Sequence, residues 1–586
     1  MSAVNNVNQP RVNQLGYLTA ASKGATVEHP SSVPVDWQLR DVASGKTVAA
    51  GVTRPRGIDP TAGVNVHTID FTAAQPQPGT YQLICDGISS PAFCVADSLY
   101  APLLHDSLVV FTLQRSGFEI TADVAGPRYA RAAGHLGVAP NQGDTAVSPL
   151  PAGEATTTDG VDLYNGWPSQ NPHYVVDARG GWYDAGDAGK YVVNGGISVA
   201  GLLGLVERAR RHGVTLPDET LTLDEARWEL DWMLRMQVAP GLPFAGMVHH
   251  KVSDEHWTSI PTLPAEDIEP RYIHRPSTAA TLNLAAVAAQ GARVFADDPA
   301  YAAQLLDAAR TAYAAAQATP DLLAPDTNVL PNPGSGPYDD AEIDDEFYWA
   351  AAELFLTTGE QVFLDDLRAN PYHLDGSKSP WSPVGFDWRD VAAWVRMQLA
   401  TVTAPAVANA ASLTEIDQLR AHLTAQADTL IANDEPFGQL YTPDNHHYAW
   451  GSNGMVANNA AIVAAAFEVS GDTRYRDAAL AGLDYLLGRN ALGISYVVGY
   501  GHPDTHVRHQ HSRWFARAVD PTLPHAPNGT LSGGPNSDCP DPISEKLKGL
   551  PAQLCFEDHI MAFGVNEMTI NWNAALAYVA AFAATV

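Results

Sequence analysis

The first hundred residues alternate polar and apolar positions in short runs. GATVEH, DWQLRD, VNVHTIDF and TYQLICDG follow one another between residues 24 and 87, separated by turns rich in Pro, Gly and Ser. A period of two is typical of strands with one buried face. The pattern predicts a small Ig-like β-sandwich domain over residues 1–97, and this stretch offers no catalytic constellation of its own.

From Tyr100 onward the pattern changes to longer segments rich in Ala and Leu, separated by long loops. Hydrophobic periodicity predicts about twelve helices. They lie near residues 100–117, 197–213, 223–237, 277–295, 299–317, 344–358, 360–368, 386–402, 413–434, 455–470, 473–488 and 570–586. Several are apolar nearly all round, which indicates burial between other helices. Six inner and six outer helices closed into a toroid would satisfy both the number and the burial.

Composition limits the possible partners. The chain has 586 residues, is 46% hydrophobic and carries a formal net charge of −31. This acidity argues against nucleic acid and anionic membranes, whereas a neutral glycan would not be repelled. No apolar run long enough to cross a bilayer is present, and MSAVNNVNQP lacks the pattern of a signal peptide. We therefore expect no membrane span, and either a cytoplasmic protein or one whose signal has been removed.

Four cysteines fall into two local pairs. Cys85 and Cys94 flank a short turn, and Cys539 and Cys555 bracket a loop. The spacing favours two disulfides, Cys85–Cys94 and Cys539–Cys555, and hence an oxidising compartment. Four reduced thiols in a chain of this length are the alternative. We favour an extracellular protein, with the cytoplasm or the periplasm as alternatives.

The loops carry the candidate chemistry. GGWYDAGDAGK (180–190) places Asp184 and Asp187 three positions apart in a glycine-rich turn, which alone is most often a solvated turn. The loop 499–516 carries His509, His511 and Arg513 beside aromatic residues. No Cys or carboxylate follows there at zinc spacing, so hydrogen bonding to a sugar is favoured over a metal or a solvated loop. Glu567 immediately precedes the last apolar helix and could equally be a helix-start glutamate.

Many motifs occur in an order that resembles glycoside hydrolase family 9, a cellulase family. They are VNQLGY (12–17), GGWYDAGDAGKYVVNGG, STAAT (277–281), DDEFYWAAAELFLTTGE (344–360), WGSNGMVANN (450–459), DYLLGRN (484–490), SYVVGYG (495–501), GTLSGGPNS (529–537) and NEMTINWNAALA. The resemblance covers nearly the whole chain. It implies an N-terminal Ig-like module followed by a mainly α (α/α)6-barrel catalytic domain, here residues 98–586.

The resemblance also implies catalytic roles. Asp187 corresponds to the general base that activates water, Asp184 helps to hold that water, and Glu567 corresponds to the general acid. Inverting hydrolysis needs one carboxylate and one carboxylic acid on opposite sides of the sugar. We therefore expect the pKa of Glu567 to be raised by burial or by a nearby carboxylate.

Substrate-binding residues follow from the same resemblance. His511 and Arg513 map onto a His-x-Arg pair that grips the sugar, although many members have a contiguous His-His-Arg where this chain reads HQHSR. In MVHHK (247–251), His250 is the expected sugar contact. Trp450 and Trp572 are candidate stacking platforms, with a place in the core as the alternative for each.

Two predictions concern metals. Many members of the family bind a structural zinc through cysteines, whereas QRSG (114–117) and AAGH (132–135) here leave only His135, so we expect no zinc. YDDAEIDDEF (338–347) is rich in carboxylates, and the calcium ligands of the family map onto Asp345 and Glu346, with Asp390 as a distant partner. A negatively charged helix N-terminus is the alternative.

The function predicted from the sequence is an inverting hydrolase of β-1,4-glucosidic bonds in cellulose or related β-glucans. Endo action is the first choice. The alternatives are an exo-acting cellobiohydrolase or β-glucosidase on cello-oligosaccharides, and a glycan-binding protein without catalysis. Catalysis would require no cofactor, and the protein is expected to be a monomer.

Overall fold

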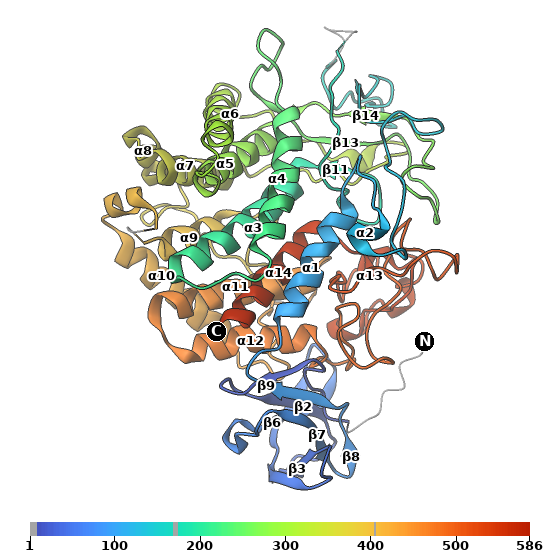
Figure 1. Cartoon of the computed structure of the whole chain (residues 1–586), viewed down its shortest axis with the longest axis vertical. Coiled ribbons are helices and arrows are strands. Elements are labelled where there is room, and N and C mark those ends of the chain that lie inside the picture. The colour runs from blue at the N-terminus through green and yellow to red at the C-terminus, as the bar shows by residue number, and fades with distance from the viewer. Residues whose placement is uncertain (1–8, 168–173, 404–405) are drawn as a thin grey trace.

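A strand-rich unit lies below a helical body in the computed structural model (Figure 1). The structure describes residues 9–167, 174–403 and 406–586; residues 1–8 of the predicted first domain lie outside the described residues. The strands of the first unit are β1 (Gly16–Leu18), β2 (Gly24–Glu28), β3 (Asp36–Asp41), β4 (Thr47–Val52), β5 (Arg54–Asp59), β6 (Val64–Asp70), β7 (Gly79–Cys85), β8 (Ile88–Ser89) and β9 (Phe93–Ala96).

These strands form two sheets that face each other across an apolar core. One has the order β1-β9-β7-β3-β4, with β8 paired to β7, and the other has the order β2-β6-β5. In β3 the buried Trp37 and Leu39 alternate with the exposed Asp36 and Gln38, as the period of two predicts. The Ig-like sandwich expected from the sequence is confirmed.

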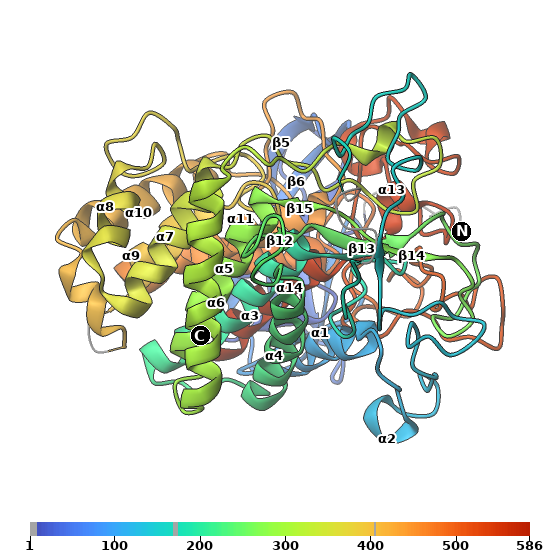
Figure 2. The ribbon, with the colours of Figure 1, turned by 90° about the horizontal axis from the view of Figure 1, so that it is seen from above.

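The contacts between helices make the helical body a closed double ring; α5 and α6, for example, lie side by side (Figure 2). Within the described residues, the inner helices contact one another in the order α3, α5, α7, α9, α11 and α14, and α14 packs back against α3. The outer helices that pack against them are α4, α6, α8, α10, α12 and α1, in the same order, and α10 also packs against α11. The mainly α, (α/α)6-barrel prediction is therefore confirmed.

The bounds of these helices lie close to the sequence expectation. They are α1 (Ala101–Gln114), α3 (Val192–His212), α4 (Glu219–Arg235), α5 (Thr278–Val294), α6 (Pro299–Ala318), α7 (Asp344–Thr358), α8 (Gln361–Ala369), α9 (Ala392–Thr401), α10 (Ile416–Ala432), α11 (Ser452–Ser470), α12 (Thr473–Leu486) and α14 (Ile570–Thr585). Two short helices, α2 (Ala122–Ala125) and α13 (Phe563–Asn566), lie in loops.

Two helix starts differ from the sequence expectation. Helix α9 begins at Ala392 rather than near 386, because the Asp387 carboxylate accepts hydrogen bonds from the backbone N–H groups of Arg389 and Asp390 and holds a turn there. Helix α3 begins earlier than expected and includes Gly195 and Gly196. A Cβ at these glycines would lie 2.2 Å from side-chain oxygens of α4 and α5. Close helix packing thus outweighs the low helix propensity of glycine.

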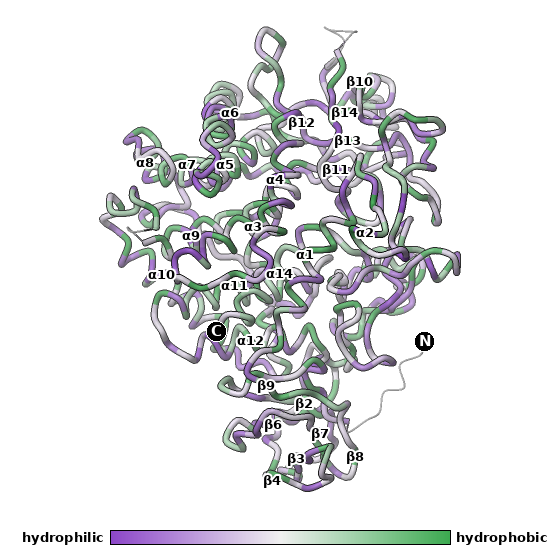
Figure 3. Tube along the Cα trace, in the orientation of Figure 1, coloured by the Kyte–Doolittle hydropathy of each residue, from purple (hydrophilic) through white to green (hydrophobic). Residues whose placement is uncertain are grey.

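Inner and outer helices differ in burial as their sequences predict. Helix α5 is buried at nearly every position, whereas α8 buries only Phe363, Leu364 and Leu367. Hydrophobic positions run along the central helices α3 and α14 (Figure 3). Among the described residues, α3 alone is long and apolar enough to match a membrane span by composition, but it is buried inside the barrel. Its apolar character is that of a core helix.

The disulfide prediction for the first domain is wrong. All four cysteines are free thiols. Cys94 pairs with Thr80 in the β7–β9 ladder, and Cys85 lies five residues further along β7. At strand spacing this is a separation of about 16 Å, far beyond the reach of a disulfide.

The second pair of cysteines has a different geometry, although it too is unbonded. Cys539 and Cys555 are both buried, and their thiols interact with each other. Burial raises the pKa of Cys555 to about 12, which favours the inert thiol form. A Cys539–Cys555 bond is not present in this structure, and its formation by oxidation stays a prediction.

Candidate active site

The loop Gly180–Lys190 runs between α1 and α3 and is held at both ends. Its start bonds to the end of α1, because the Tyr183 N–H donates to the Gln114 carbonyl at 2.8 Å. Its end forms β11 (Lys190–Tyr191), which pairs with β13 (Lys251–Asp254). Asp184 and Asp187 are only 1% and 5% exposed. The solvated-turn alternative for this stretch is therefore wrong.

Two segments that are far from this loop in sequence, 511–513 and 566–570, meet at it. The Arg513 N–H donates to the Gly186 carbonyl at 3.0 Å, and the Ile570 N–H donates to the Asp184 carbonyl at 2.9 Å. The His511 N–H donates to the Asn566 carbonyl at 2.9 Å. A Cβ at Gly186 would lie 2.2 Å from the His511 carbonyl oxygen, so only glycine permits this approach. The backbone thus brings the predicted acid, base and sugar-binding residues to one place.

Each oxygen of Asp184 has a side-chain partner. The Asn194 amide donates to Oδ1 at 2.7 Å, and the Tyr338 hydroxyl donates to Oδ2 at 2.8 Å. Burial raises the pKa of Asp184 to about 7; these hydrogen bonds oppose the rise, and the charge of Asp187 adds to it. Asp187 Oδ2 accepts from the Gly189 N–H at 3.0 Å and from the Tyr191 hydroxyl at 3.4 Å.

Glu567 lies in an environment that favours the protonated acid. Burial raises its pKa well above the ordinary range, and the negative charge of Asp187 raises it further, against an opposing effect of Arg513. A carboxylic acid that keeps its proton near neutrality can donate it to a leaving oxygen. Asp187 close by supplies a second carboxyl group, so the site holds an acid and a candidate base.

His511 and Arg513 are fixed by the same loops. His511 Nδ1 lies 2.7 Å from the Ile560 carbonyl oxygen, and burial, with Arg513 nearby, lowers its pKa to about 4. The neutral ring is a hydrogen-bonding group rather than a charge. Arg513 donates from Nε to Thr258 Oγ1 at 2.6 Å and from Nη1 to the Gly186 carbonyl at 3.0 Å.

The other predicted sugar contacts fall into different environments. His250 is buried, with Nδ1 2.9 Å from Ser277 Oγ and Nε2 3.2 Å from the Pro337 carbonyl oxygen. Both nitrogens are therefore engaged within the protein, and Nε2 holds the segment that carries Tyr338. Trp572 packs closely against glycines in neighbouring loops. Trp450 is 42% exposed and lies 6.0 Å from Phe563, whose ring is 5.7 Å from His511. Trp450 fits a stacking platform best.

Sequence reasoning missed three residues of the site. Asn194 and Tyr338 hold Asp184, and Trp257, 46% exposed, lies 5.6 Å from the Arg513 guanidinium. Asn194 and Tyr338 carry no local sequence signal, because only the tertiary contact with Asp184 distinguishes them. A lone Trp in the polar stretch SDEHWTS is a signal that could have indicated Trp257.

The predicted calcium residues lie at the start of α7 with unpaired oxygens. Asp345 Oδ1 and both carboxyl oxygens of Glu346 are buried without a hydrogen-bond partner, as is Asp340 Oδ2. Asp345 Oδ2 accepts from the Val391 N–H at 2.8 Å. Asp390 is more exposed and pairs weakly with Arg389 at 3.9 Å. The donor set suits a hard cation, with Asp340 as a ligand that the sequence did not indicate.

The place of the family zinc site holds no thiolate. Ser116 and Gly134 stand where cysteines would be needed, and His135 Nδ1 lies 2.7 Å from the Tyr183 hydroxyl. Ligand atoms of His135, Asp254 and Asp267 lie within 4.8 Å of one another. However, the Arg271 guanidinium already pairs with Asp254 at 2.7 Å. Zinc would have to displace this cation, so the donor set does not fit, and the absence of zinc stays a prediction.

The fold and the site together define a class of protein: a helical-barrel glycoside hydrolase with a carboxylic acid and a carboxylate at one end of the barrel. Residues 100–580 match the profile of glycosyl hydrolase family 9, and residues 6–90 match the cellulase N-terminal ig-like domain. The chain belongs to glycosyl hydrolase family 9.

Individual relatives are similar over almost the whole chain. Endoglucanase C of Cellulomonas fimi is 48% identical over 98% of this chain, which spans about half of that protein, 52%. A cellulose 1,4-beta-cellobiosidase of Acetivibrio thermocellus is 37% identical over 98% of this chain and 67% of its own length. A solved thermostable endoglucanase of Alicyclobacillus acidocaldarius superposes with a TM-score of 0.79 at 30% identity, covering 98% of this chain and 99% of that one.

Proposed function

We propose that this chain is an inverting hydrolase of β-1,4-glucosidic bonds in cellulose or related β-glucans. The observation that carries the proposal is that Glu567 and Asp187 lie in one site: Glu567 pairs with His511 through the backbone, and the Arg513 N–H bonds to the Gly186 carbonyl beside Asp187. Desolvation and the charge of Asp187 raise the pKa of Glu567, as a general acid requires. Asp187 takes a proton from water, and the water oxygen attacks the anomeric carbon. Glu567 gives its proton to the departing glycosidic oxygen, and the configuration at the anomeric carbon is inverted.

Other residues support these two. Asn194 and Tyr338 hold Asp184, which assists in placing the water beside Asp187. Arg513, His511 and the exposed ring of Trp450 bind the sugar next to the scissile bond. Arg513 also donates to the Gly186 carbonyl and so helps to hold the catalytic loop.

Substitution of the acid and the base tests this function. Asp187→Asn and Glu567→Gln are each expected to lower kcat about 10²–10⁴-fold, the range of general acid–base catalysis, because each removes a proton transfer and leaves the fold intact. Reducing-sugar release from carboxymethyl cellulose and a thermal melt measure the two effects. Asp177→Asn, three residues before the loop and partly exposed, is the control. Near-wild-type turnover by either variant would contradict the assignment.

Endo action is the mode we propose, and an exo-acting enzyme is the second candidate. Endoglucanase C supports the first, and the name of the cellobiosidase relative supports the second. Random cleavage lowers the viscosity of carboxymethyl cellulose before much reducing sugar appears, whereas exo cleavage does not. A slow viscosity fall at equal sugar release would favour the exo mode. Glycan binding without any release would favour the non-catalytic alternative.

We also propose a structural calcium ion held by Asp345 and Glu346, with Asp340 and Asp390 as further ligands. The unpaired buried oxygens support it, and the ion would neutralise their charge without entering the reaction. A monomeric, extracellular protein that binds neither nucleic acid nor membranes remains our proposal. The formal net charge of −31 supports the part that concerns nucleic acid and membranes.

A further inference from the structure

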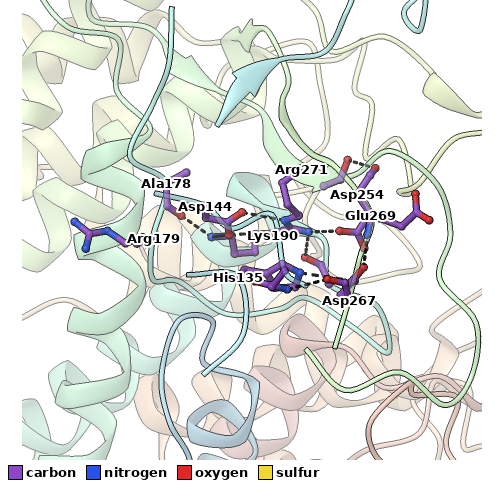
Figure 4. Close-up of polar contacts among 12 residues, drawn as sticks. His135, Asp144, Ala178, Arg179, Lys190, Asp254, Asp267, Glu269 and Arg271 are labelled. Atoms are coloured by element: carbon purple, nitrogen blue, oxygen red, sulfur yellow. Dashed lines mark hydrogen bonds and ion pairs between the residues drawn. The ribbon is translucent and has the colours of Figure 1, made fainter. Parts of the chain in front are cut away.

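A buried network of charges joins Asp144, Lys190, Asp254 and Arg271 (Figure 4). Its centre is Arg271, on β14 (Arg271–Ile273). Arg271 donates to both oxygens of Asp144, from Nε at 2.9 Å and from Nη2 at 3.2 Å. It also donates from Nη1 to Asp254 Oδ1 at 2.7 Å. All three side chains are almost completely buried, so the guanidinium joins two carboxylates inside the protein.

The same guanidinium reaches the catalytic loop. Arg271 Nη1 donates to the Ala188 carbonyl at 2.8 Å, and Ala188 follows Asp187 directly in the sequence. Lys190 continues the network on the other side of Asp144, with Nζ 2.7 Å from Asp144 Oδ2. Lys190 Nζ also donates to the carbonyls of Ala178 and Gly180, at 2.6 and 2.9 Å. Two buried cations therefore bind the backbone on both sides of the two aspartates.

A small sheet carries these groups in fixed register. The strand order is β10 (Ser148–Pro149), β14, β13 and β11. Arg271 pairs with Asp254 across β14 and β13, and Val252 of β13 pairs with Lys190 of β11. Lys190 thus lies on β11, which ends the loop, and Arg271 lies on β14, two strands away. Backbone pairing therefore sets the distance between the two cations.

A contribution to the stability of the fold does not by itself explain why such a network of buried charges is present. The cost of removing charges from water offsets most of their attraction, and a packed apolar cluster often stabilises a fold equally well. An apolar cluster would, however, leave the Ala188 carbonyl without its donor. The planar fork of arginine supplies several donors in fixed directions, which lysine cannot reproduce. The network is therefore suited to fixing the backbone at a defined place.

We propose that Arg271 is a positioning residue for Asp187: anchored by Asp144 and Asp254, it fixes the Ala188 carbonyl and thereby the carboxylate of the base. This inference rests on the proposed function, in which Asp187 is the base. A displacement of a reacting group by about 1 Å can cost about 100-fold in rate. Sugar binding, which involves other loops, would change little.

Arg271→Lys tests the proposal, with Arg293→Lys as the matched control. Arg293 on α5 is half-buried, with a side chain only 13% exposed, and also donates to two carboxylates, Glu207 and Glu353, at 2.7 Å each. Its bonds hold the barrel helices. We expect Arg271→Lys to lower kcat on a soluble cello-oligosaccharide about 100-fold, with KM changed by less than about threefold. Arg293→Lys should lower the melting temperature to a similar extent and keep kcat within about threefold of wild type.

Asp144→Asn is the second variant, because it weakens the network while keeping Arg271, and it serves if Arg271→Lys does not fold. It should lower kcat in the same way. Folded variants at Arg271 or Asp144 with wild-type kcat, or with a changed KM alone, would overturn the proposal. Asp187→Asn in the same assay distinguishes a failure of the proposed function from a failure of the positioning role. If it stays active, the proposed base is wrong; if it is inactive while the network variants are active, only the positioning role fails.

Discussion

Asp184 and Asp187 stand three positions apart, yet the protein surrounds them differently. The side chains of Asn194 and Tyr338 donate hydrogen bonds to Asp184. Asp187 instead accepts a hydrogen bond from the Gly189 N–H, and its charge acts on the Glu567 carboxyl group. Burial and neighbouring carboxyl charges raise the pKa of Asp184 and of Glu567, although Asp184 accepts two side-chain hydrogen bonds that oppose the rise. A raised pKa is what a general acid such as Glu567 needs in order to keep its proton until the proton is donated.

The raised pKa of Asp184 has a consequence for stability. The folded protein binds a proton at Asp184 up to about pH 7, whereas the unfolded chain releases it near pH 4. The stability that this proton contributes is thus present below about pH 4 and is lost as the pH rises through 7. Asp184→Asn should melt higher relative to wild type at pH 8 than at pH 4. Thermal melts at both pH values measure this, and an equal difference at both would contradict it.

Trp257 is the exposed aromatic beside Arg513. Its ring lies where a sugar bound by Arg513 would find an apolar face, and aromatic contacts of this kind contribute about 0.5–1.5 kcal/mol. Trp257→Ala should raise KM for a soluble cello-oligosaccharide about two- to tenfold and leave kcat nearly unchanged. The half-buried Trp228, on the outer helix α4, gives the comparison variant Trp228→Phe, for which we expect no change in KM. An unchanged KM for Trp257→Ala would exclude stacking at this ring.

At the scale of elements, function depends on what precedes each inner helix. The catalytic loop precedes α3, Glu567 precedes α14 and the acidic cluster opens α7. Inner and outer helices alternate along the chain and run in opposite directions. The loops that precede the inner helices therefore lie at the same end of the barrel. The site is therefore assembled from loops whose positions are set by helix packing.

The acidic start of α7 is the element on which chelation should act. With no cation, the buried oxygens of Asp345 and Glu346 would be left unneutralised. Removal of divalent ions with EDTA should lower the melting temperature by several degrees, as expected for loss of a ligand bound only by the folded state, and added calcium should restore it. In Glu346→Gln the shift should be much smaller. A melting temperature that is insensitive to EDTA would contradict the calcium proposal.

At the scale of the whole molecule, the Ig-like domain and the barrel are joined by buried polar contacts. The Asn13 amide donates to Tyr100 Oη at 3.0 Å and to Asp484 Oδ1 at 2.8 Å. Tyr100 precedes the first barrel helix, and Asp484 lies on α12. Burial raises the pKa of Asp484 to about 7, against the opposing charge of Arg489 and the hydrogen bond from Asn13. The two domains are therefore expected to unfold together.

Asn13→Leu removes this link while keeping the side-chain volume. It leaves buried polar atoms of Asp484 and Tyr100 unpaired, at a cost of about 1–3 kcal/mol or more. We expect a lower melting temperature and a barrel that unfolds separately from the first domain in calorimetry. Asn65→Leu removes hydrogen bonds to His29 and Ser31 inside the first domain alone, and its barrel transition should stay at the wild-type temperature. A single unshifted transition for Asn13→Leu would contradict the coupling.

Much of the architecture could be predicted because local patterns carry it. Period-two alternation indicated the sandwich, and all-round apolar segments such as α5 and α11 indicated inner helices. The errors came where distant contacts override local preference. Packing of Gly195 and Gly196 against α4 and α5 extends α3, and the register of β7 and β9 separates Cys85 from Cys94.

The sequence by itself determined the two kinds of domain, the family resemblance and the identity of Asp184, Asp187 and Glu567, because each depends on residue order along a short stretch. Only the tertiary structure decided which groups surround them. Tyr338, Trp257 and Arg271 come from loops and strands far from the aspartates in sequence, and of these three only Trp257 has a local signal. Burial and charge, which raise the pKa of Glu567, arise only when these segments meet. The pKa values and contacts of the site residues therefore depend on tertiary packing, whereas the helices and strands that pack can be predicted from the hydrophobic pattern.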